Sequence, residues 1–213
     1  MKKHILCFGD SNTHGYCAIP TESEDGGARF TENERWTCLL GKLLGDDYLV
    51  IEEGLSGRTT VFEDPLHEGL SGLSVIYPCM MSHEPLDMLI IMLGTNDTKE
   101  RFNANPACIA AGMKRLVEKA KTVNAWKDGK PNILIVAPPH ILSHFYDANM
   151  GEGCVEKSCK TAEFYEAVAK ECGCAFLDAE GVAEFNQKDC MHLTKKGHAA
   201  LAAKLKDIVI SLT

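Results

Sequence analysis

Residues 5–16 read Ile-Leu-Cys-Phe-Gly-Asp-Ser-Asn-Thr-His-Gly-Tyr. The first four are apolar, as is typical of a buried strand, and Gly9 permits a tight turn where that strand ends. Asp10 and Ser11 carry oxygens that satisfy free N–H groups at the start of a helix, so a simple helix cap explains them when the stretch is read alone. The stretch also predicts that Ser11 lies at the carboxyl end of the first strand, where open α/β sheets bind ligands.

The same alternation of strand and helix continues along the chain. Four more apolar, strand-like runs follow: Tyr48–Ile51, Met88–Leu93, Ile133–Ala137 and Ala175–Leu177. Apolar residues at spacings of three and four predict helices over Glu34–Leu44, Pro106–Val123, Lys160–Lys170 and Thr194–Leu212. Asn105 and Thr194 are the expected caps of two of them. Strands that alternate with helices imply a parallel sheet covered on both faces, so we expect a three-layer α/β/α fold.

Length and composition fit one domain over residues 1–213, because no linker, repeat or low-complexity stretch divides the chain. The formal net charge of −8 argues against nucleic acid or an anionic membrane as the main partner. No apolar run approaches the ~20 residues of a membrane helix, and the N-terminal run is too short for a signal peptide. We therefore expect a cytoplasmic protein whose ten scattered cysteines stay reduced. No metal or other cofactor is expected.

Two polar loops follow the second and third predicted strands. The first, residues 52–60, contains Gly57, and the second places Asn96 directly after an apolar strand. If the first three strands are neighbours, Ser11, Gly57 and Asn96 converge at one edge of the sheet. Backbone N–H groups and an amide aimed at one point form an oxyanion hole. An ordinary turn after a strand is the simpler explanation of Asn96 alone.

Asp189 and His192 lie just before the last predicted helix. An Asp at this spacing can fold back and accept the Nδ1–H of the His ring, which leaves Nε2 free as a base. Such a pair activates a serine nucleophile, here Ser11. The alternative is a turn-capping Asp189 beside a surface His192, and two ligands at this spacing do not make a metal site.

Four short blocks, in this order, resemble the SGNH or GDSL hydrolase superfamily: Gly9-Asp10-Ser11, Gly57, Gly94-Thr95-Asn96-Asp97 and Asp189-x-x-His192. The stretches Arg35-Trp36-Thr37, 52–60 and Ala137-Pro138-Pro139 resemble its arylesterase and acyltransferase branch more closely. The resemblance covers nearly the whole chain and implies a flavodoxin-like fold with a five-stranded parallel sheet.

The resemblance also implies a role for each matched residue. Ser11 is the implied nucleophile, His192 the general base and Asp189 the carboxylate that orients it. The N–H of Ser11, the N–H of Gly57 and the side chain of Asn96 are the implied oxyanion donors.

Substrate contacts are less well defined by these blocks. Asn12 stands where the GDSL form commonly has Leu, and we expect Asn12 and Tyr16 to line the mouth of the pocket. His140 is a further expected contact, because the irregular stretches 17–33 and 138–155 are the expected pocket walls. Arg58 is expected to anchor its loop through a carboxylate such as that of Glu53, and contact with the substrate is the alternative interpretation.

These observations predict a serine esterase that hydrolyses or transfers the acyl group of a small carboxylic ester. A carbohydrate O-deacetylase of the same superfamily is the nearest alternative. A noncatalytic flavodoxin-like module that binds phosphate or a flavin at the same sheet edge is an alternative of another class, but it has no need of Asp189 and His192. The expected partner is a small-molecule ester, with no nucleic acid or membrane, and self-association into a homo-oligomer stays open.

Overall fold

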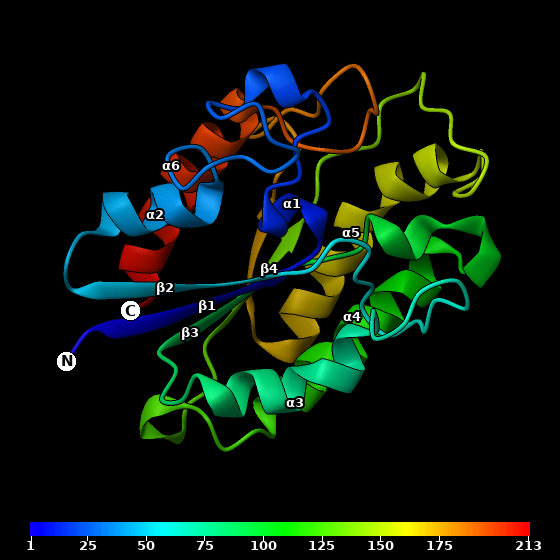
Figure 1. Ribbon diagram of the computed structural model, residues 1–213. Helices are drawn as coiled ribbons and strands as arrows, with labels where there is room; N and C mark the ends of the chain where they lie inside the picture. The colour runs from blue at the N-terminus through cyan, green and yellow to red at the C-terminus, as the bar shows by residue number, and fades with distance from the viewer.

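The computed structural model describes residues 1–213 (Figure 1). Its strands are β1 (Lys3–Gly9), β2 (Tyr48–Gly54), β3 (Met88–Met92), β4 (Ile133–Ala137) and β5 (Ala175–Asp178). Its helices are α1 (Ser11–His14), α2 (Trp36–Leu44), α3 (Gly72–Ser82), α4 (Pro106–Lys121), α5 (Cys154–Cys172) and α6 (Lys195–Leu212). Short 3₁₀ turns lie at Pro20–Glu22, Asn96–Thr98, Glu100–Phe102 and Lys127–Gly129. No helix has both the length and the apolar composition needed to cross a membrane.

The five strands form one parallel sheet in the order β2-β1-β3-β4-β5. Ile5 of β1 pairs with Val50 of β2 on one side and with Met88 of β3 on the other. The expected three-layer α/β/α fold is therefore confirmed. Because β1 lies between β2 and β3, the loops that follow these three strands are neighbours at the carboxyl edge of the sheet.

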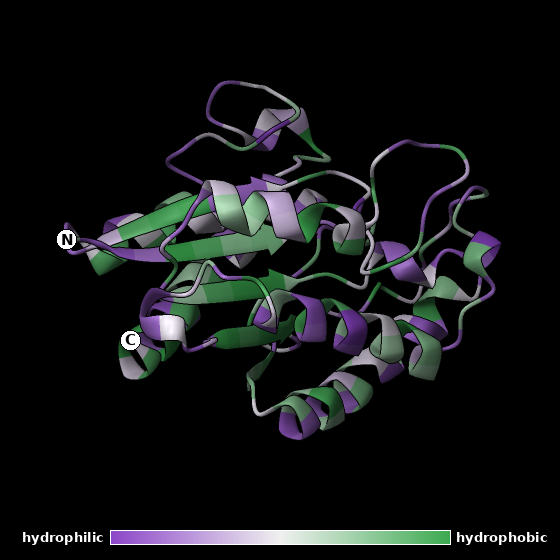
Figure 2. Cartoon of the chain, turned by 90° about the horizontal axis from the view of Figure 1, so that it is seen from below, coloured by the Kyte–Doolittle hydropathy of each residue, from purple (hydrophilic) through white to green (hydrophobic).

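Helices cover both faces of the sheet, and each face has its own core (Figure 1). Side chains alternate between the two faces along a strand, so Leu6 and Phe8 pack with α3, α4 and α5, while Ile5 and Cys7 pack with α2 and α6. Every residue of β3 and β4 is buried, as expected for central parallel strands. Figure 2 shows these strands as apolar ribbons between helices that carry polar residues on their outer sides.

Two helices differ from the sequence-based prediction. Helix α3 is not predicted, because Pro78 lies inside it and its many apolar residues, such as Val75 and Ile76, are not restricted to one helical face. Helix α5 begins at Cys154 rather than Lys160, because its first turns bury the small polar residues Ser158 and Thr161. Both predicted caps are confirmed: the side chain of Asn105 accepts from Cys108 N, and that of Thr194 accepts from Gly197 N, each at 2.9 Å.

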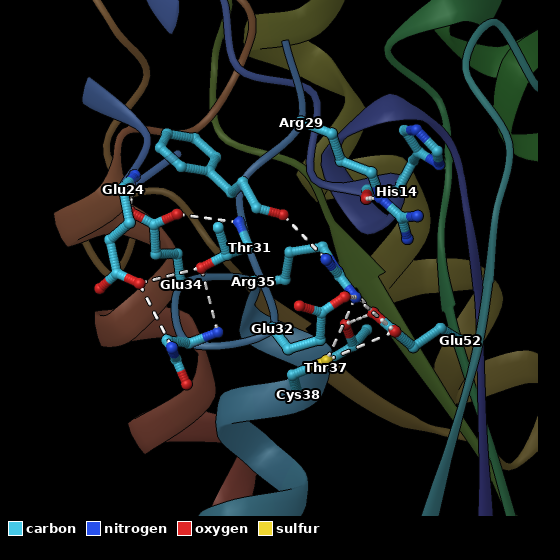
Figure 3. A network of polar contacts seen from close by, with 12 residues as sticks. His14, Glu24, Arg29, Thr31, Glu32, Glu34, Arg35, Thr37, Cys38 and Glu52 are labelled. Carbon is cyan, nitrogen blue, oxygen red and sulfur yellow. Dashed lines mark hydrogen bonds and ion pairs between the residues drawn. The ribbon is translucent and has the colours of Figure 1, made fainter. Parts of the chain in front are cut away.

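A buried polar network fixes the loop 17–33 against α2 and β2 (Figure 3). The carboxylate of Glu34 accepts the N–H of Thr31 at 2.8 Å and pairs with Lys195 at 2.9 Å. Arg35 forms two hydrogen bonds with the carboxylate of Glu52, at 2.9 and 3.0 Å. Burial alone raises the pKa of each carboxyl group, but the hydrogen bonds outweigh it and lower the pKa of both Glu34 and Glu52 to about 2.

Candidate active site

Ser11 lies at the turn between β1 and α1, as predicted. Asp10 is the N-cap of α1, and its carboxylate accepts the N–H of Asn12 at 2.9 Å. Gly9 allows the helix to follow the strand so closely, because a Cβ atom there would lie 2.0 Å from Thr13 Oγ1. Ser11 lies at the carboxyl edge of the sheet. It is only 5% exposed, so it has little contact with bulk water.

A continuous chain of hydrogen bonds joins Ser11, His192 and Asp189. The distance from Ser11 Oγ to His192 Nε2 is 2.8 Å, and that from His192 Nδ1 to Asp189 Oδ2 is also 2.8 Å. Burial raises the pKa of Asp189, but hydrogen bonds from His192, Asn186 and Met191 N outweigh it, so the pKa lies below its ordinary value. Asp189 is therefore a carboxylate at neutral pH and holds the imidazole with Nε2 toward the serine.

The loop that carries Asp189 and His192 is held by a residue that the sequence did not single out. The side-chain amide of Asn186 donates to Asp189 Oδ1 and to the carbonyl of His192, both at 2.8 Å. Between them Cys190 adopts a φ of 66°, which bends the chain so that both side chains turn toward each other. An Asn three residues before the Asp is the only sequence signal for this contact, and it is common in turns.

Asn12 corrects one expectation about substrate contacts. Its Nδ2 donates to the carbonyl of Met191 at 3.1 Å, and its Oδ1 accepts the N–H of Leu193 at 2.9 Å. It is 2% exposed and does not border the cleft around Ser11. Asn12 therefore does not line the pocket mouth. It holds the main chain on both sides of His192 from beneath.

Gly57 and Asn96 lie beside Ser11 in the same cleft. Gly57 has a φ of 89°, and its N–H donates no hydrogen bond within the protein. Asn96 Nδ2 makes only long bonds, 3.2 Å to the carbonyl of Arg58 and 3.4 Å to Asp10 Oδ2. Those two contacts fix the orientation of the amide. Ser11, Gly57 and Asn96 lie close together because each follows one of three neighbouring strands, in the order β2-β1-β3.

Arg58 anchors the loop that carries Gly57. Its Nη1 donates to the carbonyl of Gly9 at 3.0 Å and to the carbonyl of Glu53, and its guanidinium lies 4.1 Å from the centre of the Phe8 ring. The anchoring role is as expected, but the partner at Glu53 is the main-chain oxygen rather than the carboxylate.

Two buried carboxyl groups support the site from below. Asp97 accepts the N–H and the hydroxyl of Thr60, which ties the loop after β3 to the loop after β2. Burial raises the pKa of Asp97 to about 6, and it raises that of Asp10 to about 6 as well. Burial beneath the site disfavours the charged form of both carboxyl groups.

The cleft has a volume of about 430 Å³ and contains Ser11, Asp189 and His192. Tyr16 borders it, as expected, with its ring centre 4.6 Å from that of His192. The loop between β4 and α5 supplies the expected second wall through Phe145, Tyr146, Asp147 and Met150. Ser56, Lys188 and Met191 complete the lining and were not predicted, because only the folded loops decide which of their side chains face Ser11.

His140 corrects a second expectation. It borders a different cavity, of about 670 Å³, together with Ile19 and Glu22 of the loop 17–33. None of Ser11, Asp189 and His192 borders that cavity. The main-chain N–H of His140 donates to Glu180 at 2.7 Å, and its ring lies 3.7 Å from the same carboxylate. His140 therefore lies away from Ser11, and the loop 17–33 borders this second cavity instead of the cleft.

A model of the GDSL-like Lipase/Acylhydrolase family matches residues 7–200. No curated protein matches the chain at a significant level. Among solved structures, the native aryl esterase of M. smegmatis is 39% identical over 99% of this chain and 100% of its own, with a TM-score of 0.89.

Two further solved structures are similarly close. Est24, a carbohydrate acetylesterase from Sinorhizobium meliloti, is 36% identical over all of both chains, with a TM-score of 0.90. A putative arylesterase from Agrobacterium tumefaciens is 32% identical over 99% of this chain and 100% of its own, with a TM-score of 0.86.

Proposed function

This chain belongs to the GDSL-like lipase/acylhydrolase family and is a carboxylic ester hydrolase of the SGNH type, and from that premise we propose that it cleaves small esters through an acyl-enzyme on Ser11. The observation that carries the proposal is the chain from Ser11 Oγ through His192 to Asp189, with both distances 2.8 Å, opening into the cleft. The proposal treats residues 1–213 as one esterase domain, because a single sheet uses all five strands.

In the first step, His192 Nε2 takes the proton of Ser11 as Oγ attacks the ester carbonyl carbon. The carbonyl oxygen becomes an oxyanion, which accepts from the N–H groups of Ser11 and Gly57 and from the side chain of Asn96. Each such donor typically lowers the barrier by about 3 kcal/mol. The protonated His192 then gives its proton to the leaving alcohol, and the acyl group stays on Ser11.

In the second step, His192 takes a proton from water as the water oxygen attacks the acyl carbon. The bond between that carbon and Ser11 Oγ then breaks, His192 returns its proton to Oγ, and the acid leaves. An alcohol in the same position yields a new ester, which is acyl transfer. Asp189 stays ionised throughout, since its pKa lies below the ordinary value, and stabilises the imidazolium that forms twice in the cycle.

The cleft favours short acyl groups. Its volume of about 430 Å³ lies at the lower end of the range for ligand pockets, roughly 300–1,000 Å³. It has to hold the alcohol part of the ester as well as the acyl group. We therefore infer that acetyl esters react faster than long-chain esters.

An acetylated carbohydrate is a second candidate substrate, favoured by the polar part of the cleft lining. Ser56, Asp147 and Lys188 offer hydrogen-bonding groups of the kind that sugar hydroxyls need. Release of acetate from an acetylated xylo-oligosaccharide, compared with p-nitrophenyl acetate, measures this preference. A higher kcat/KM on the sugar ester, reduced by Asp147→Ala without loss on p-nitrophenyl acetate, is the expected result.

The test of the reaction itself is hydrolysis of p-nitrophenyl acetate, butyrate and octanoate by the wild type and Ser11→Ala. We expect the wild type to be fastest on acetate and the variant to lose at least about 10³-fold in kcat. Thr13→Ser, a buried neighbour on α1 that is not part of the triad, is the matched control. Equal activity of wild type and Ser11→Ala contradicts the proposal.

A further inference from the structure

Three metal-ligating side chains gather outside the cleft, where the end of β2 meets the end of α3. Glu53, Cys79 and His83 each offer one ligand atom, and these atoms all lie within 4.8 Å of one another. None of the three borders the cleft around Ser11. The ester hydrolysis described above uses none of them, so the cluster calls for its own explanation.

The fold brings the cluster together through two regular elements. Cys79 and His83 are four positions apart at the C-terminal end of α3, so they lie on one face of the helix. Along β2 successive side chains point to opposite faces: Glu52 reaches Arg35 beside α2, while Glu53 reaches His83 beside α3. Strand and helix hold these positions more firmly than loops do.

The cluster is partly exposed to solvent, and its acidic member, Glu53, can attract a cation. The side chains of Glu53 and His83 are 32% and 28% exposed, and Cys79 is half-buried. Glu53 Oε1 lies 2.8 Å from His83 Nε2. The neighbouring cation, Arg58, is bound to the carbonyls of Gly9 and Glu53 and stacked on Phe8, so these contacts hold its guanidinium in place.

We propose that Glu53, Cys79 and His83 bind a Zn²⁺ ion, with water as the fourth ligand. A thiolate, an imidazole and a carboxylate are the ligand types that Zn²⁺ accepts, whereas Mg²⁺ and Ca²⁺ prefer oxygen alone. Tetrahedral bonds of about 2.0–2.3 Å place ligand atoms about 3.3–3.8 Å apart. The separations here, from 2.8 Å to at most 4.8 Å, span that range.

Binding breaks the S–H bond of Cys79, whose proton leaves to the buffer, and the two bonding electrons stay on sulfur as a ligand pair. The thiolate and the carboxylate then cancel both charges of the ion. No oxidation or reduction takes part.

The test uses Co²⁺, which reports a thiolate ligand by a charge-transfer band in the near ultraviolet, on the full chain kept reduced and freed of metal by a chelator. We expect one equivalent of Co²⁺ to give the band and one equivalent of Zn²⁺ to abolish it. Cys79→Ser should lack the band and bind Zn²⁺ weaker by about tenfold or more. His83→Gln should keep a weaker band, and unchanged circular dichroism shows that both variants are folded.

Two matched controls exclude other sites. Cys172→Ser removes another half-buried thiol, and His192→Gln removes the imidazole nearest to Cys190 in the chain. Both should retain the full band and the wild-type affinity. Absence of a thiolate band in the wild type, its survival in Cys79→Ser, or its loss in His192→Gln overturns the proposal, and none of these results bears on the role of Ser11.

Discussion

At the scale of single residues, Asn12 links Ser11 and His192, the proposed nucleophile and base. It follows Ser11 directly in the chain, yet its amide contacts the main chain on both sides of His192. A shift of the α1 turn therefore moves the base together with the hydroxyl. The sequence showed the unusual residue but not this role, because a contact across 179 positions depends on how the last loop folds over the sheet.

Replacing Asn12 by Leu, the residue common in the GDSL form, should lower kcat by about 10²-fold. The reason is geometric: a shift of about 1 Å in a catalytic group costs that much, while the cleft lining stays intact and KM changes little. Steady-state kinetics on p-nitrophenyl acetate measure both parameters. The control is Asn132→Ala, which removes another side-chain amide that bonds two carbonyls, those of Asp87 and Leu212. A kcat for Asn12→Leu equal to that of the control speaks against the positioning role.

Asn96→Ala tests the proposed oxyanion hole. We expect kcat to fall by about 10²–10³-fold, because the amide acts on charge that develops only in the transition state, and KM to stay within a few-fold of the wild type. Asn96 also bonds the carbonyl of Arg58, so stability should fall by about 1 kcal/mol, which urea unfolding measures. A rise in KM with an unchanged kcat is incompatible with an oxyanion role.

At the scale of elements, the three loops after β1, β2 and β3 create the site. They are tied to one another by Arg58 on Gly9, Asp97 on Thr60 and Asn96 on Arg58. The loop with Asp189 and His192 then closes over them from the far end of the chain. The sequence predicted the ends of β1 and β3 to within one residue, because each apolar run stops at a Gly. Strand β2 continues to Gly54, three residues beyond the predicted end at Ile51, because its last residues include the polar Glu52 and Glu53. The sequence could not predict α3, because Pro78 interrupts the segment and its apolar residues do not keep to one helical face.

The loop 17–33 depends on one buried carboxylate, which leads to a prediction about pH. Burial raises the pKa of Glu34, but the hydrogen bonds to its carboxylate lower it by more, so the pKa falls to about 2. A depressed carboxyl pKa stabilises the fold above the unfolded value of about 4.3, and this contribution is lost as pH falls through about 2. Glu34→Gln should therefore cost about 2 kcal/mol at pH 7 and progressively less between about pH 4.3 and pH 2.

Urea unfolding of the wild type and Glu34→Gln at several pH values measures this difference. Glu156→Gln, which removes an exposed carboxylate paired with Lys160, is the control and should change stability little at any pH. A difference between wild type and Glu34→Gln that stays constant down to pH 2 contradicts the assignment of a low pKa to Glu34.

At the scale of the whole molecule, the fold and the grouping of the proposed catalytic residues could be predicted from the sequence for the same reason. In a parallel sheet the residues after consecutive apolar strands meet at one edge, so Ser11, Gly57 and Asn96 were expected together before their distances were known. The cleft lining was not accessible in this way. Asn12 is turned inward and His140 faces another cavity, and neither outcome follows from a position in the chain, because both depend on how long loops pack against each other.

The most direct test of the account is to trap the acyl-enzyme. The protein is mixed with p-nitrophenyl acetate, quenched in acid within the first turnover and digested for peptide mass spectrometry. The account predicts one added acetyl group on the peptide that contains Ser11, none in Ser11→Ala, and slower formation in His192→Gln. An acetyl group on a different residue of the active wild-type protein, or turnover by Ser11→Ala at the wild-type rate, would show that Ser11 is not the nucleophile.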